Sequence, residues 1–170
     1  MQLLPTLLEA VRTTIFQDAL KATLGQVCEL GNWDYGEAWI PNQNGTILQH
    51  SSAFYINTHQ SRDCISALEQ FRLCSHALIL TPGVGLPGRV WLSQQPEWIC
   101  DVSVQPETYF LRHYIAKALG VKTGLGVPVL VNNQVLAVLV FFMLSVRPED
   151  KQLVKLAKDA ATQLGARFLN

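Results

Sequence analysis

Residues 123–144 read TGLGVPVLV-NN-QVLAVLVFFML and decide the fold. Two apolar arms rich in β-branched and aromatic residues flank the pair Asn132-Asn133. Asparagine tolerates the positive φ that a two-residue turn requires, so the stretch predicts an antiparallel β-hairpin. Bulky apolar side chains on both faces of the hairpin must be buried against other elements of the chain. We therefore expect it in the middle of a sheet, with helices behind it and a roofed hollow in front.

A glycine-punctuated stretch, GVGLPG at residues 83–88, runs directly into Arg89, Val90 and Trp91. Glycine has no Cβ, so this loop can lie close over the sheet. It lacks both the Lys-Ser/Thr of a P-loop and the longer spacing of a dinucleotide fingerprint. We interpret it as a packing turn rather than a phosphate cradle. Together with the hairpin it indicates a sheet with a covered pocket, which is typical of a receptor.

The composition indicates one compact domain over residues 1–170, of which 49% are hydrophobic. The sequence has no apolar run of about eighteen residues and no signal peptide pattern, so we expect no membrane contact and a cytoplasmic location. Thirteen basic and thirteen acidic residues are scattered without blocks, so we expect no nucleic-acid partner.

Helices are predicted at both ends of the chain, over residues 1–30 and 148–169, each with apolar residues at intervals of three and four. Between them, hairpin-connected strands predict an antiparallel sheet and an α+β fold. The other expected strands are residues 33–40, 46–56, 77–80 and 98–102, and the other expected helices are residues 61–74, 89–94 and 108–119. In the first strand, Trp33, Tyr35, Glu37 and Trp39 are expected on one face.

Five stretches in order resemble a GAF domain: NWDYGEAW at 32–39, GLPGRVW at 85–91, QPEWI at 95–99, FLR at 110–112 and GVPV at 126–129. The resemblance is to GAF domains of bacterial, especially cyanobacterial, sensor histidine kinases. It implies a central antiparallel sheet of five or six strands, with the N- and C-terminal helices on one face. Loops and short helices would roof a ligand pocket on the other face. It also implies a homodimer through the terminal helices, signalling by helix packing, and a chain cut from a larger two-component sensor.

The expected ligand is a small molecule of open identity. A cation beside aromatic rings suits an anionic or planar ligand, and Arg112 and His113 follow two aromatic residues. Alternatively, Arg112 pairs with a local acid and the tryptophans belong to the core. The candidate ligand-binding residues are Trp91, Trp98, Cys100, Tyr109, Phe110, Arg112 and His113.

A covalently attached bilin is not expected at the site that relatives use, which leaves Cys100 as the alternative attachment residue. The Cys-His pair that bilin-binding relatives carry aligns with Leu111 and Arg112, so the attaching thiol is missing. The four cysteines lack metal-site spacing and are expected to be reduced and mostly buried; they are Cys28, Cys64, Cys74 and Cys100. Some GAF proteins reduce free methionine sulfoxide with nearby cysteines, but the spacing here differs from theirs. We therefore expect a non-catalytic sensory domain. The alternatives are a structural dimerisation module without ligand and a thiol-dependent redox enzyme.

Overall fold

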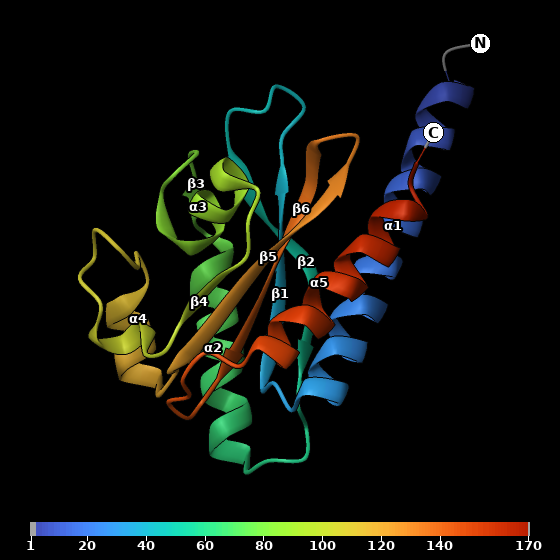
Figure 1. Cartoon of the computed structure of the whole chain (residues 1–170). Helices are drawn as coiled ribbons and strands as arrows, with labels where there is room; N and C mark the ends of the chain where they lie inside the picture. The colour runs from blue at the N-terminus through green and yellow to red at the C-terminus, as the bar shows by residue number, and fades with distance from the viewer. Residues whose placement is uncertain (1–2, 170) are drawn as a thin grey trace.

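The computed structural model describes residues 3–169 (Figure 1), so residues 1, 2 and 170 of the expected 1–170 domain lie outside the described residues. The helices are α1 (Leu3–Gly31), α2 (Arg62–His76), α3 (Gly85–Ser93), the short 3₁₀ helix η1 (Val102–Val104), α4 (His113–Leu119) and α5 (Lys151–Ala166). The strands are β1 (Tyr35–Pro41), β2 (Leu48–Ile56), β3 (Ile79–Leu80), β4 (Glu97–Ile99), β5 (Thr123–Val131) and β6 (Gln134–Met143).

The strands form one six-stranded sheet in the order β3-β2-β1-β6-β5-β4. Every neighbouring pair in it is antiparallel. The α+β class and the antiparallel sheet expected from the sequence are therefore confirmed. Within residues 3–169, no helix combines the length and the apolar character that crossing a membrane requires.

The hairpin predicted over residues 123–144 is present as β5 and β6, with β6 next to the centre of the sheet. Asn132 and Asn133 form its turn with φ values of 52° and 64°, the left-handed geometry that a two-residue turn needs. Successive side chains of β6 point to opposite faces, and both sets are buried. The hairpin thus supplies the apolar surface for two separate cores.

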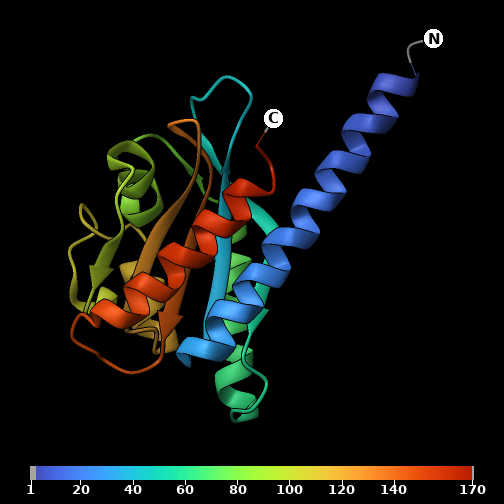
Figure 2. The same cartoon turned by 45° about the vertical axis from the view of Figure 1, so that its right-hand side comes forward.

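The first core lies between the sheet and the two terminal helices. α1 and α5 run side by side over this face (Figures 1 and 2), as expected. Asp150 is the N-cap of α5, because its carboxylate accepts from the backbone N–H groups of Gln152 and Leu153. The apolar stripe of α5 faces the sheet and α1, with Ala157, Ala161 and Leu164 fully buried.

The second core lies on the opposite face, under α2, α3, η1 and α4. α3 approaches β5 very closely at Gly126, where an added Cβ would stand 2.8 Å from Val90 Cγ2. Glycines of the stretch 83–88 were expected to allow a close approach to the sheet. At this contact the glycine that allows it is Gly126, which lies on the strand. The space that was expected to hold a pocket is filled by fully buried side chains, among them Trp39, Phe71, Phe110 and Phe142.

Three local expectations were wrong. The stretch 83–88 is not wholly a loop, because α3 begins at Gly85 and Pro87 falls in its first turn, where a missing N–H costs little. The helix expected over 108–119 begins only at His113, because Tyr109 and Phe110 both close a turn on the carbonyl of Pro106. Trp33 precedes β1 and packs in the first core, whereas Tyr35 packs in the second.

The cysteines also differ from expectation. All four are free, but Cys28 alone is buried, Cys64 is half-buried, and Cys74 and Cys100 are exposed. The expectation of mostly buried thiols was therefore wrong. α2 buries one narrow stripe that includes Leu68 and Phe71, and Cys74 lies outside it.

Candidate functional site

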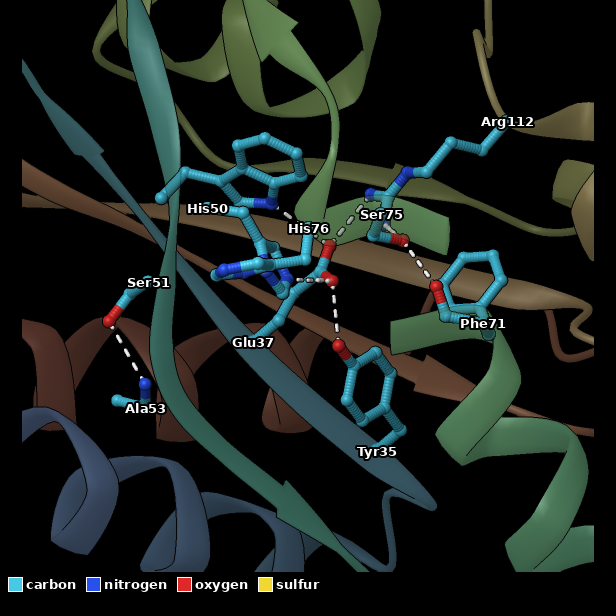
Figure 3. A network of polar contacts seen from close by, with 10 residues as sticks. Tyr35, Glu37, His50, Ser51, Ala53, Phe71, Ser75, His76 and Arg112 are labelled. Carbon is cyan, nitrogen blue, oxygen red and sulfur yellow. Dashed lines mark hydrogen bonds and ion pairs between the residues drawn. The ribbon is translucent and has the colours of Figure 1, made fainter. Parts of the chain in front are cut away.

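Glu37 stands in the middle of β1 with its side chain fully buried in the second core. Residues two apart on a strand share a face, so Tyr35 and Trp39 flank it on the same side. Tyr35 Oη donates to Glu37 Oε2 at 2.9 Å, and Trp39 Nε1 donates to Glu37 Oε1 at 2.9 Å (Figure 3). A single strand thus brings a carboxylate and two of its donors into the interior.

Arg112 supplies the opposing charge from the turn before α4. Its Nη2 lies 2.7 Å from Glu37 Oε1, and its side chain is 3% exposed. Its Nη1 donates to Ser75 Oγ at 2.8 Å, and Ser75 Oγ donates in turn to the carbonyl of Phe71 at 2.6 Å (Figure 3). The guanidinium carbon lies 4.9 to 5.5 Å from the centroids of four rings, Trp39, Phe71, Phe110 and Phe142. Aromatic rings therefore surround the Arg112 guanidinium, and both of its terminal nitrogens lie close to a polar partner.

Two histidines extend the network toward the surface. His50 on β2 is buried and places Nε2 3.0 Å from Glu37 Oε2. Its Nδ1 lies 3.1 Å from Nδ1 of His76, the exposed last residue of α2 (Figure 3). The network therefore runs from the solvent at His76 through His50 to the buried carboxylate.

The electrostatics of the network favour an ionised Glu37. Burial alone raises the pKa of its carboxyl, but the Arg112 guanidinium and the His50 hydrogen bond outweigh burial and hold the pKa well below its ordinary range. Burial first, and then the neighbouring Glu37 charge, raise the pKa of Tyr35 well above its usual value, so the phenol remains a donor. The Glu37–Arg112 pair is neutral overall and has several hydrogen-bond partners, the condition under which a buried ion pair is tolerated.

Two of the predicted site residues, Phe110 and Arg112, belong to this network or its cage. Trp98 does not, because it packs in the first core against Trp33 at 5.4 Å and donates from Nε1 to the carbonyl of Arg147. The sheet separates Trp98 from Arg112, so the two do not line a common space.

The other four predicted residues lie apart from this network. Trp91, half-buried on α3, lines a surface hollow beside the loop between β1 and β2. Tyr109 is exposed and stacks on the guanidinium of Arg89 at 4.1 Å, and Cys100 is exposed just after β4. His113 opens α4 with its ring 3.8 Å from that of Tyr114. Ligand binding by these residues stays a prediction.

The sequence interpretation missed Glu37, His50, Ser75 and His76 as members of a site. One signal was available in the sequence. Glu37 lies between Tyr35 and Trp39 on the same face of a strand whose other residues are mostly apolar, so its side chain should be buried. A buried carboxylate requires a cationic partner. The alternative in which Arg112 pairs with an acid is the one the structure shows, although this acid is distant in the sequence.

The chain is thus an α+β domain built on one six-stranded antiparallel sheet, with the polar network inside its second core. The sequence pattern of the GAF domain matches residues 13–167, so the chain belongs to the GAF domain family.

Solved structures show the same fold. The GAF domain of a phosphoenolpyruvate-protein phosphotransferase from Coxiella burnetii superposes with a TM-score of 0.65 at 21% identity, covering 89% of this chain and 80% of that one. The free methionine-R-sulfoxide reductase of Neisseria meningitidis superposes with a TM-score of 0.65 at 15% identity, covering 90% and 77%. At these identities the likeness concerns the fold alone.

A shorter sequence match links the chain to a transcription factor. Over 66 residues it is 33% identical to transcription factor bHLH13 of Arabidopsis thaliana, a stretch that makes up 39% of this chain and 11% of that protein. The chain thus spans about a tenth of the length of this relative.

Proposed function

We propose that this chain is a non-catalytic regulatory GAF module of a signal-transduction protein, and that it acts by pairing with a second copy through α1. One observation carries the proposal: four large apolar side chains on the N-terminal half of α1 are exposed. They are Leu7 at 62%, Leu8 at 56%, Val11 at 49% and Ile15 at 52%. This half of α1 projects beyond the sheet (Figure 2).

The spacing of these residues suits a second helix of the same kind. Leu8, Val11 and Ile15 recur at intervals of three and four, the pattern of a coiled-coil seam. Continuing the seam along α1 passes through Asp18 and leads to Ala22 and Gly25, which line a shallow depression of about 680 Å³ together with Lys21 and Glu29. Small residues there let another backbone approach closely. Covering the half-exposed apolar side chains would contribute roughly 1 kcal/mol each.

The second terminal helix does not offer a comparable surface. The apolar stripe of α5 is buried inside the chain against the sheet and α1, as at Ala161 and Leu164. Association through the terminal helices therefore depends on α1, and a shift in its packing would move the sheet directly beneath it. This coupling supports a role in a sensor, such as the sensor histidine kinases that contain GAF domains similar to this sequence.

The oligomeric state tests the proposal. Leu8→Glu with Ile15→Glu places two charges on the seam and should convert a dimer, with twice the 18.9 kDa chain mass, into a monomer by light scattering. Ala10→Glu with Thr13→Glu adds the same charge on the opposite side of the helix and should leave the dimer intact. A wild-type chain that stays monomeric at high concentration, or a seam variant that still dimerises, removes the proposal.

A ligand-binding role is the second candidate, and the caged guanidinium of Arg112 is the observation that favours it. A small anion that replaced the Glu37 carboxylate would meet the same donors. Native mass spectrometry with an absorption scan, on protein purified from its own host, tests this role. A bound small molecule supports sensing, and an unliganded chain mass favours the assembly module.

A reductase role is the third alternative, because the family includes folds with that activity. It requires two thiols within reach of one another. Cys64 and Cys74 are ten residues apart on α2, about 15 Å along the axis, and so cannot pair. Burial raises the pKa of Cys28 well above its usual value and disfavours the reactive thiolate. Thiol-dependent turnover of methionine sulfoxide that disappears in Cys100→Ser would contradict the non-catalytic assignment.

A further inference from the structure

We propose that His50 and His76 form a binding site for a divalent transition-metal ion that prefers nitrogen ligands. The two imidazoles come from β2 and from the last residue of α2, and their Nδ1 atoms face each other at 3.1 Å. The network around Glu37 uses the other ring nitrogen of His50. The Nδ1 pair is therefore the part of the network that is directed toward the exposed side.

The tautomer of His50 follows from its partner. Glu37 is an ionised carboxylate and can accept only, so Nε2 of His50 carries the hydrogen that points at Oε2. In the neutral ring, Nδ1 then holds a lone pair, and His76 must donate from its own Nδ1. A metal ion would take the place of that hydrogen when the ring of His76 carries its proton on Nε2 instead, which frees the Nδ1 lone pair and keeps the ring neutral.

A carboxylate behind a histidine is the arrangement that orients metal-binding imidazoles in proteins. Glu37 is itself fixed by Arg112, Tyr35 and Trp39, so the lone pair of His50 is held in one direction before any ion arrives. His76 is exposed and ends its helix, so it can adjust. One half of the site is rigid and the other half can move.

The separation of the two nitrogens also fits an ion. Two metal–nitrogen bonds of about 2.0 Å place their nitrogens about 2.8 Å apart at the right angle that Ni²⁺ prefers, and about 3.3 Å apart at the tetrahedral angle that Zn²⁺ prefers. The observed 3.1 Å lies between these two values, so a small rotation of His76 can supply either geometry. Among the described residues no group of three His, Cys, Asp or Glu converges, so two imidazoles bind and water completes the coordination.

The charged groups around the two histidines do not oppose the binding of a cation. The nearest cation in the network, Arg112, is paired with Glu37. His76 lies at the C-terminus of the 15-residue helix α2, where the helix dipole favours positive charge. The ion would enter from the solvent side, past His76.

Titration calorimetry with nickel chloride on the untagged chain tests the site, with paramagnetic broadening of NMR signals to locate the ion. We expect one saturable Ni²⁺ per chain, with broadening centred on His50 and His76. His76→Asn, at an exposed position, should weaken binding at least tenfold. His59→Asn, His113→Asn and Cys74→Ser are matched controls that should bind as the wild type does.

Three results would overturn the assignment. One is His76→Asn binding Ni²⁺ as tightly as the wild type. Another is loss of binding in Cys74→Ser, or broadening centred on His59 or His113. The third is the absence of saturable binding to the wild-type chain.

Discussion

Replacing Glu37 by Gln keeps the shape of the side chain but removes the negative charge that Arg112 faces at 2.7 Å. The guanidinium would remain caged among aromatic rings without a counter-charge. His50 would lose its ionised acceptor as well. Removing one partner of a buried ion pair typically costs about 3–5 kcal/mol. The total stability of a domain is about 5–15 kcal/mol, so this one atom exchange should remove a large part of it.

Urea unfolding followed by tryptophan fluorescence measures the loss. With a denaturant dependence of about 2 kcal/mol per molar urea, the expected cost lowers the midpoint of Glu37→Gln by about 2 M. The matched control is Glu97→Gln, which removes the same charge from the Arg89–Glu97 pair at 2.7 Å. Those side chains are 21% and 27% exposed, so the control should lose no more than about 1 kcal/mol.

The pH dependence gives the prediction a second, independent readout. The folded pKa of Glu37 is depressed, so its contribution to stability is complete above the unfolded value and is lost as pH falls. Between pH 5 and pH 3, where free histidine is already protonated, the wild type should lose stability that Glu37→Gln cannot lose. The gap between them should narrow by up to about 1.4 kcal/mol for each pH unit below about 4.3.

Two results would refute the role assigned to Glu37. One is a loss in Glu37→Gln no larger than that of Glu97→Gln. The other is a stability gap that stays constant between pH 5 and pH 3. In either case the carboxylate would not be held ionised by Arg112 in the folded chain.

Three further predictions concern packing, capping and thiol exposure. Gly126→Ala places a methyl group 2.8 Å from Val90 Cγ2, so it should destabilise the chain by about 1–3 kcal/mol and lower Tm in calorimetry. Asp150→Ala removes the cap of α5 and should cost about 1 kcal/mol by urea unfolding; an unchanged midpoint would contradict the capping role. Ellman's reagent should modify Cys74 and Cys100 at once but Cys28 only on unfolding, because that thiol is buried and its pKa is raised. Early labelling of Cys28 in mass spectrometry would contradict its burial.

The parts of the fold that local pattern controls could be predicted from the sequence. The turn at Asn132 and Asn133, the apolar arms around it and the stripes of the terminal helices each depend on residues within a few positions of one another. The helix over 108–119 was predicted too long, because the turn at Pro106 is set by how Phe110 and Arg112 enter the core. That requirement comes from tertiary packing rather than from local preference.

The polar network could be predicted only in part. Arg112 was identified as a cation among aromatic side chains, and Phe110 is among the rings around it. Its true partner, Glu37, lies on a distant strand, and His50 and His76 join it from two further elements. A periodic pattern can place Glu37 on a buried face. It cannot say which of several arginines crosses the core to meet it.

Both edge strands of the sheet are very short. β3, at one edge, has two residues, and β4, at the other edge, has three. Each of them pairs with only part of its longer neighbour, β3 with Leu48 and Gln49 of β2, and β4 with residues 124–126 of β5. Within residues 3–169 the remainder of β2 and β5 therefore has no strand beside it on the outer side. Unpaired backbone of this kind is where an extended segment of another chain can add to a sheet.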